Sequence, residues 1–204
     1  EEFGRPIANH GITLVPGDCV YVDLNADGEI NSNDATRDIG YTDMPEYTAG
    51  LNTGFSWKNF DFSMQWTGAW NVDRMLDEFR RPLGDTNEKG LLLYQYDTTW
   101  RSSADTFTAK FPRTSSLHAS NNYAGSDLYL INASYLRLKS VEIGYNFNFP
   151  FMKKLKMDNC RLYVNGYNLI TITGFKWGDP ESRQSSRPNY PLTRVFNIGL
   201  KLGF

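Results

Sequence analysis

The closing stretch of the chain, R-V-F-N-I-G-L-K-L-G-F at positions 194–204, decides its fold. Small or polar residues alternate in it with apolar ones, which are Phe196, Ile198, Leu200, Leu202 and Phe204. Successive side chains of a β-strand point to opposite faces of the sheet. The stretch therefore predicts a strand with one apolar face and one face of small or polar residues.

Two kinds of protein end on such a strand. An alternating apolar strand with a terminal Phe resembles the closing strand of a bacterial outer-membrane β-barrel, in which this pattern serves as the assembly signal. The last strand of a secreted β-sandwich has the same alternation when one of its faces packs on a core. Residues 194–204 do not choose between the two, so the rest of the chain must.

Composition narrows the class of protein. The 21 Lys and Arg residues nearly balance the 23 Asp and Glu residues, so we expect no nucleic-acid partner. Aromatic residues make up 15% of the 204 residues, which suits β-strands and also the aromatic girdles of membrane barrels. No apolar run approaches the roughly 20 residues of a spanning helix. Helical membrane proteins are thereby excluded, whereas barrels are not.

A hairpin is predicted before the middle of the chain. Apolar and small or polar residues alternate over 47–57, a length that matches the roughly 9 to 11 residues of a barrel strand. Lys58 and Asn59 form a short turn, after which Phe60, Phe62 and further alternate residues resume the apolar face up to Trp66.

Further strands follow a long polar stretch. Residues 71–134 read as a loop rich in Asp, Ser, Thr, Asn and Gly, with a weakly helical piece over 73–80. Strand character returns at Tyr135, but the apolar phase changes along this strand. Either a bulge near Lys139 or Ser140 restores the phase, or one part of the strand lies above the membrane, where the phase is free, and the sequence does not choose between the two. Residues 161–173 and the closing stretch bring the total to about five strands, too few to close a membrane barrel, which needs about eight.

Connections alternate between short and long, with short ones at Lys58 and near Pro150 and longer ones after Asn71 and Gly174. Short turns at one end and long loops at the other are typical of outer-membrane barrels. The chain opens on Glu1 without a signal peptide, so we expect either that a leader has been removed or that the chain is a piece of a longer protein.

Residues 23–34 read D-L-N-A-D-G-E-I-N-S-N-D and fit a calcium loop, with Asp in place of the usual Glu at its twelfth position. The predicted ligands are Asp23, Asn25, Asp27, the backbone carbonyl of Glu29, and Asp34, with Asn31 acting through a water. The flanks do not read as EF-hand helices, so a dockerin-type loop is the closer match. We predict a structural calcium ion, with an ion-free acidic turn as the alternative.

Five ordered segments resemble one protein family. They are P-G-D-C-V-Y-V-D-L-N-A-D-G-E-I at 16–30, I-G-Y-T-D-M-P-E-Y-T-A-G-L at 39–51, S-Y-L-R-L-K-S-V-E-I-G-Y at 134–145, L-Y-V-N-G-Y-N-L at 162–169, and the closing stretch. Together they resemble the carboxyl-terminal region of the SusC/RagA-type TonB-dependent outer-membrane transporters of Bacteroidota. The resemblance covers almost the entire chain.

That resemblance implies an all-β fold, an antiparallel transmembrane β-barrel of about 22 strands, to which this chain contributes about five carboxyl-terminal strands and long extracellular loops. It also implies a place in the bacterial outer membrane, surrounded by lipid. The implied partners are a SusD-like surface lipoprotein that acts as a lid, TonB through the missing amino-terminal part, and an oligosaccharide or peptide substrate. Without a TonB box and plug, these residues alone are not expected to transport anything.

The implied topology assigns sides of the membrane. Residues 1–46 would form an extracellular region with the calcium loop, and residues 47–204 would carry the strands, with a long extracellular loop at about 71–134. The turns at Lys58 and Pro150 would be periplasmic. Cys19 and Cys160 would then lie at opposite ends of the barrel, and we predict that they are not bonded to each other.

Two other functions were open on the sequence. A secreted, calcium-stabilised β-sandwich that binds carbohydrate would use the same aromatic residues to stack on sugar rings. A glycosidase would need two paired carboxylates, but the Asp and Glu residues lie in turns or in the calcium loop, and His10 and His118 have no recognisable nucleophile partner. We therefore predict that the chain is not an enzyme.

Overall fold

The computed structural model describes all residues except 1–6, 78–79, 81–92, 151–155 and 183–191. The chain divides into two compact units. Unit 1 comprises Glu1–Gly40 and Met75–Ile131, and unit 2 comprises Tyr41–Arg74 and Asn132–Phe204. The expected division at residue 46 into a loop region and a strand region concerns sides of the membrane, and it stays a prediction.

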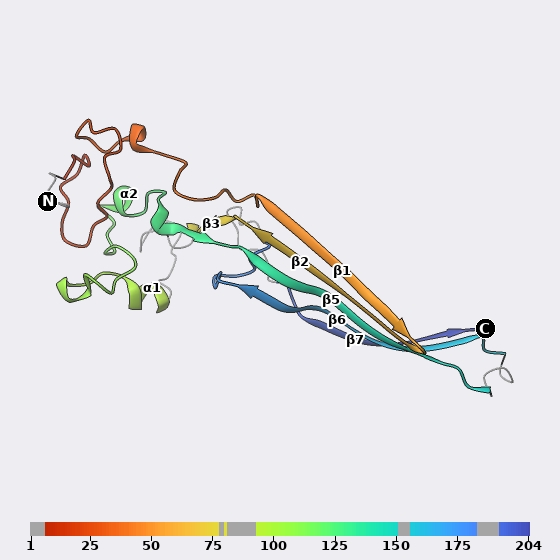
Figure 1. The fold of residues 1–204 in the computed structure, drawn as a ribbon. Helices are drawn as coiled ribbons and strands as arrows, with labels where there is room; N and C mark the ends of the chain where they lie inside the picture. Colours follow the sequence, from red (N-terminus) through yellow and green to blue (C-terminus); the bar gives the residue numbers. More distant parts are fainter. Residues whose placement is uncertain (1–6, 78–79, 81–92, 151–155, 183–191) are drawn as a thin grey trace. The chain divides into compact units, whose positions relative to one another are not determined.

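Unit 2 is built on a five-stranded antiparallel sheet (Figure 1). Its strands are β1 (Tyr47–Trp57), β2 (Phe60–Trp70), β5 (Tyr135–Phe147), β6 (Asn159–Thr173) and β7 (Val195–Gly203), and they lie side by side in that order. The number of strands and the all-β class are as predicted. Such an up-and-down order is the connectivity of a barrel wall.

The β1–β2 hairpin turns over two residues. Trp57 pairs with Phe60, which leaves Lys58 and Asn59 as the loop, as predicted. Lys58 has a φ of 55°, in the left-handed region that tight hairpin turns use. Its ammonium group lies 4.8 Å from the centroid of the Trp57 ring, a contact that favours this turn conformation.

Irregularities in two neighbouring strands keep the apolar residues of the sheet in phase. The β2–β5 register shifts so that Gln65 faces Ser140 while Trp66 faces Leu138, which leaves Lys139 as an extra residue. This confirms the predicted bulge. In β6, Asn168 has a φ of 54° opposite the same place. Without the extra residue, every side chain of β5 beyond it would change faces.

Unit 1 consists of short elements around one buried aromatic residue. They are the 3-10 turns η1 (Ser32–Asp34), η3 (Ser103–Asp105) and η4 (Asp127–Tyr129) and the helices α1 (Leu93–Thr98) and α2 (Ala119–Asn122). Tyr129 has no exposed surface, stacks on Phe111 at 5.9 Å between ring centroids, and donates its hydroxyl proton to the carbonyl of Asn122 at 2.7 Å. None of the described helices is long and apolar enough to cross a membrane.

The predicted helical piece over 73–80 is wrong for its first part. Asp73–Met75 form a short strand, β3, which pairs with β4 (Leu130–Asn132), while residues 78 and 79 lie outside the described residues. The extended conformation of Asp73 is fixed by tertiary contacts. Its N–H donates to the carbonyl of Thr42 at 3.1 Å, and its buried carboxylate accepts the N–H of Tyr41 at 2.7 Å.

The β-sandwich alternative is wrong as well. Within the described residues, the only other sheet is the two-stranded β3–β4 pair, which is too small to cover five long strands. Phe204 is 80% exposed and so does not anchor a core between two sheets.

Candidate functional site: a two-faced barrel wall

The cross-strand register aligns the apolar residues of all five strands on one face of the sheet, the apolar face. One row across the strands consists of Phe55, Phe62, Ile143, Val164 and Ile198, and the next consists of Trp57, Phe60, Tyr145, Leu162 and Leu200. No Asp, Glu, Lys or Arg is among the register-paired residues of this face. The alternation predicted strand by strand therefore adds up to a continuous uncharged surface.

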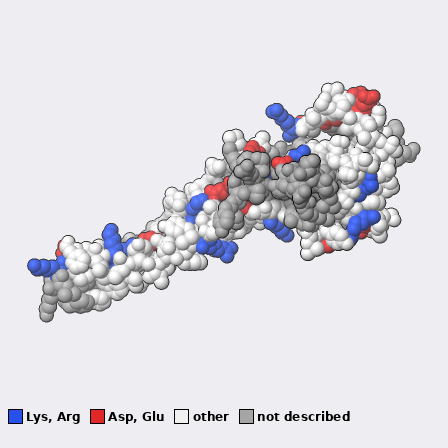
Figure 2. Space-filling model, turned by 180° about the vertical axis from the view of Figure 1, so that it is seen from behind, with Lys and Arg blue, Asp and Glu red and all other residues white. Residues whose placement is uncertain are grey.

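Much of this apolar face is exposed. Ile198 is 78% exposed and Phe55 is 62% exposed, and large side chains such as Leu51 and Ile172 are more than half exposed. Charged side chains form only small groups along the sheet in one view of the molecule (Figure 2). A continuous row of exposed apolar side chains without charges suits contact with lipid.

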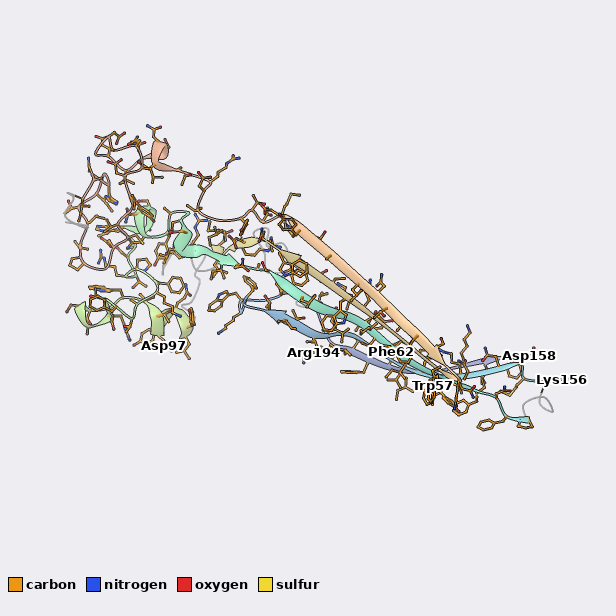
Figure 3. All side chains as sticks on the ribbon, in the orientation of Figure 1. Trp57, Phe62, Asp97, Lys156, Asp158 and Arg194 are labelled. Atoms are coloured by element: carbon orange, nitrogen blue, oxygen red, sulfur yellow. The ribbon has the colours of Figure 1, made fainter. Side chains whose placement is uncertain are left out.

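Aromatic rings gather at one end of the sheet. Phe60, Tyr145, Phe147 and Phe149 follow one another with 4.6, 4.9 and 5.4 Å between successive ring centroids. Trp57 lies at the same end, where β1 stops, and the charged residues Lys156 and Asp158 lie near the start of β6 (Figure 3). Rings followed by charges mark the level at which barrel strands leave the hydrocarbon.

The opposite face of the sheet, the polar face, carries an ion network. Arg161 of β6 bonds to both oxygens of the Asp61 carboxylate on β2 and donates to Glu142 of β5 at 2.7 Å. Asn146 donates to Asp61 at 3.1 Å, and Asn165 donates to Glu142 at 3.2 Å. Each carboxylate thus has a cationic and an amide partner, which compensate for the water that these partly buried groups have lost.

A missing side chain on β5 makes this network possible. Arg161 reaches β2 by crossing β5 at Gly144, where a Cβ atom would lie 2.4 Å from its Nη2 atom. Any larger residue at position 144 would push the guanidinium group away from Asp61. This pairing could not be predicted from the sequence, because the two charges are 100 residues apart.

A second ion cluster lies farther along the polar face. The buried Arg137 donates to Asp179 and to Glu181 at 2.6 Å each, and to the hydroxyl of Thr171 at 3.0 Å. Lys139 donates to Glu181 at 2.9 Å. These bonds hold residues 179–181 of the β6–β7 connection against the sheet.

In the predicted calcium loop, the acidic side chains bind backbone N–H groups. Asp23 accepts from Ala26 at 2.6 Å and from Gly28 at 2.8 Å, and Asp34 accepts from Leu24 at 2.9 Å and from Asn31 at 2.8 Å. The N–H of Asn31, followed by that of Leu24, holds the pKa of the Asp34 carboxyl below its usual range. Within the described residues, no group of three or more His, Cys, Asp or Glu side chains is placed to hold a metal ion.

The other proposed ligands make contacts of the same kind. Asp27 accepts from the N–H of Glu29 at 2.9 Å and from the side chain of Asn25 at 2.8 Å. Gly28 has a φ of 86°, which allows the sharp bend. An ionised carboxylate can accept about four hydrogen bonds or metal contacts, so these bonds leave lone pairs available. Whether calcium uses them stays a prediction.

Unit 1 contains a hub that the sequence did not reveal, the Asp18 cluster. The carboxylate of Asp18 is fully buried and accepts from Arg113 at 2.7 Å and from Asn122 at 2.9 Å. His118 Nδ1 lies 2.6 Å from its other oxygen, which also accepts the N–H of Val15 at 3.0 Å. The cluster joins segments about a hundred residues apart and thereby holds unit 1 together.

Burial of the Asp18 carboxyl opposes its ionisation, but the hydrogen bonds from Val15, Arg113, Asn122 and His118 outweigh it and hold the pKa well below its usual range. Burial also raises the pKa of the neighbouring Cys19 thiol to about 11, which makes this thiol a poor nucleophile. Cys19 and Cys160 are both free thiols, and they belong to different units.

The residue types of a hydrolase triad occur near one another in unit 1, as Ser115, His118 and Asp18, but their hydrogen bonds are not those of a triad. The Ser115 hydroxyl accepts the backbone N–H of His118 at 3.1 Å and a bond from the Arg113 guanidinium at 3.5 Å. His10 is engaged by its surroundings, since its Nε2 accepts the N–H of Tyr21 at 2.9 Å. Both histidines therefore have contacts that stabilise loops.

Comparison with known proteins decides the family. TonB-dependent receptor P3 of Formosa agariphila is 30% identical over 206 residues, which cover 93% of this chain and 19% of that protein. TonB-dependent receptor SusC of Bacteroides thetaiotaomicron is 28% identical over 206 residues, which cover 100% of this chain and 18% of that protein. The chain belongs to the SusC/RagA-type TonB-dependent receptors. No family model matches it.

Solved structures agree on the fold of this SusC/RagA-type chain. The RagAB peptide importer in its open-open state superposes with a TM-score of 0.69 and 22% identity, over 91% of this chain and 20% of that one. The closed-closed state of RagAB gives a TM-score of 0.64. The sheet is thus part of an outer-membrane β-barrel, with its apolar face toward lipid and its polar face toward the lumen.

The chain spans about a fifth of the length of the relatives that it matches. Both relatives are named as TonB-dependent receptors. Because this chain belongs to their family, the prediction of an outer-membrane protein that is not an enzyme is confirmed.

Proposed function

We propose that the chain forms part of the barrel wall of an energy-coupled importer that takes up oligosaccharides or peptides. The observation that carries this proposal is that the strand register gives the sheet two different faces. One face has uncharged residues and meets lipid, and the other has the Asp61–Arg161–Glu142 network and meets the lumen. Such a wall separates hydrocarbon from a wet passage and does no chemistry itself.

The partners follow from the family. A SusD-like surface lipoprotein would close the extracellular side, and TonB would act through an amino-terminal part of the protein outside this chain. The relative named SusC and the RagAB peptide importer support this arrangement in general. Among the described residues, the polar face carries amides and charges of both signs, which suit glycans and peptides alike.

Import is tested in a native-host strain that lacks the full-length gene. We expect this strain to lose growth on one class of nutrient, either oligosaccharides or peptides, when that class limits growth, and to recover with the wild-type gene. A tagged full-length receptor extracted in mild detergent should retain a lipoprotein. Unchanged growth on every glycan and peptide tested would contradict the proposal, as would wild-type uptake in cells without TonB.

We also propose that residues 23–34 bind one structural calcium ion. The donor set fits this metal, since Asp23, Asn25, Asp27 and Asp34 offer hard oxygen atoms and Glu29 can add its carbonyl. Their bonds to backbone N–H groups support the proposal because they fix the side chains at the loop without using up their lone pairs.

Replacing Asp23 with Ala is expected to abolish calcium binding by this loop. Loops of extracellular modules bind calcium with a Kd of about 10⁻⁴ to 10⁻³ M, so the full-length receptor should be titrated by calorimetry after treatment with a chelator. Asp38→Ala, an exposed carboxylate just outside the loop, is the matched control and should bind as the wild type does. Equal calcium binding by both variants would refute the site. So would the absence of binding by the wild type up to 10 mM calcium, which is on the order of ten times the weakest expected Kd.

A further inference from the structure

A groove of about 340 Å³ interrupts the apolar face near the end of β2 that is farther from the Lys58 turn. Its lining residues come from three strands and are Ala49, Gly50, Leu51, Trp66, Trp70 and Leu136. No charged, hydroxyl or carboxamide side chain is among them. The groove thus offers hydrophobic contact and almost no means of orienting a polar ligand.

Small residues on neighbouring strands create the groove. Ala49 of β1 pairs with Gly68 of β2, which pairs in turn with Leu136 of β5. Large residues flank this row, because Leu51 pairs with Trp66 and Tyr47 pairs with Trp70. The register thus sets the small Ala49 among larger neighbours and leaves a recess there, while the space over Gly68 is taken by the ring of Trp70.

Gly68 has a specific part in this arrangement. A Cβ atom at position 68 would lie 2.7 Å from the Trp70 ring and 3.0 Å from the carbonyl oxygen of Tyr135. The indole of Trp70 therefore lies over the strand at Gly68 and forms one wall of the groove. Trp70 is 39% exposed even so, which leaves the other side of its ring available to a ligand.

We propose that this groove binds one acyl chain of an outer-membrane lipid. The groove is continuous with the apolar face, which contacts hydrocarbon in the barrel, so a lipid chain is the molecule that reaches it. The neighbouring row of Phe55, Phe62 and Ile143 consists of large side chains only, whereas the groove adjoins the small Ala49. An ordered chain between two Trp rings gains dispersion contacts that a flat wall does not provide.

The location within the membrane supports this occupant. Tyr47 and Trp70 pair at the end of the β1–β2 hairpin opposite to the Trp57 end, so aromatic residues stand at both ends of these strands. Aromatic residues at strand ends mark the headgroup level, which places Ala49 and Gly68 just inside the hydrocarbon. The proposal depends on the orientation of the sheet and is independent of what the receptor imports.

The test uses the full-length receptor in nanodiscs that contain a phospholipid with a photoreactive diazirine in its acyl chain. After illumination, adducts are mapped by mass spectrometry on β2 and on β7, whose apolar face is more exposed. We expect at least a fivefold higher adduct yield on 66–70 than on 196–200. Ala49→Phe, which fills the groove while keeping the face apolar, should lower the yield on β2 at least threefold.

Thr53→Phe is the matched control, because it adds the same ring to the same face of the same strand outside the groove. It should leave the adducts on β2 unchanged. Folding of each variant is checked by heat-dependent migration in gels, and Ala49→Leu replaces Ala49→Phe if that variant does not fold. Equal yields on β2 and β7 in the wild type, or the same loss with Thr53→Phe as with the Ala49 variant, would overturn the proposal.

Discussion

An arginine in place of Ile198 is expected to destabilise the folded barrel by about 2 to 4 kcal/mol, the cost of a cation on the lipid face near the bilayer midplane. Ile198 lies in the middle of β7 on the apolar face and is 78% exposed. The full-length receptor carrying Ile198→Arg should therefore lose its folded, heat-modifiable form at a clearly lower urea concentration than the wild type does.

The neighbouring position provides the control for this prediction. Asn197 lies on the polar face, where its side chain donates to Asn165 at 2.9 Å. Asn197→Arg introduces the same charge into the wet lumen, so we expect a change of at most about 1 kcal/mol, the net value of one hydrogen bond. If both variants unfold at the same urea concentration, the assignment of the two faces is wrong.

Removing the charge of Asp18 is expected to destabilise unit 1 by about 2 to 4 kcal/mol. Breaking a buried ion pair usually costs about 3 to 5 kcal/mol, and the lower range applies because Arg113 is 29% exposed. Asp18→Asn leaves the guanidinium group without its anion and sets an amide N–H against one of the present donors. Hydrogen exchange of the backbone amide of Cys19, which donates to Asn122, should accelerate accordingly.

The same cluster predicts the effect of acid. The pKa of Asp18 is lower in the folded protein than the value of about 3.9 in an unfolded chain, so its stabilisation is complete above pH 4 or so and falls as the pH drops toward the folded pKa.

Asp97→Asn, which changes an exposed carboxylate of α1 in the same unit, is the control for the exchange experiment on Asp18→Asn (Figure 3). Equal exchange rates in the two variants would show that Asp18 is not the hub.

The strands of the sheet could be predicted from the sequence because barrel strands alternate visibly. The bounds of β1 match the predicted 47–57. The phase change between Leu138 and Val141 indicated a bulge near Lys139 or Ser140 as one of two explanations, and the register of β2 and β5 shows that the bulge is the correct one. A strand with one face in lipid must keep its apolar period over its full length, and any extra residue leaves a mark in that period.

The polar contacts could not be predicted in this way. Asp18, Arg113 and Asn122 are ordinary turn residues in sequence, and only folding brings them together. The same holds for Arg161 and Asp61, whose contact depends on the absence of a side chain at Gly144. β3 was missed because three residues carry no period, and the contacts of Asp73 with Tyr41 and Thr42 decide its conformation.

The two faces of this sheet meet different solvents, and spin labels along β7 would reveal this difference residue by residue. One nitroxide at a time is placed at each position from 196 to 201 of the full-length receptor in lipid bilayers. We expect collisions with oxygen, which concentrates in lipid, to peak at Phe196, Ile198 and Leu200, and collisions with a water-soluble nickel complex to peak at the positions between them. Equal values along the strand, or the opposite phase, would contradict it.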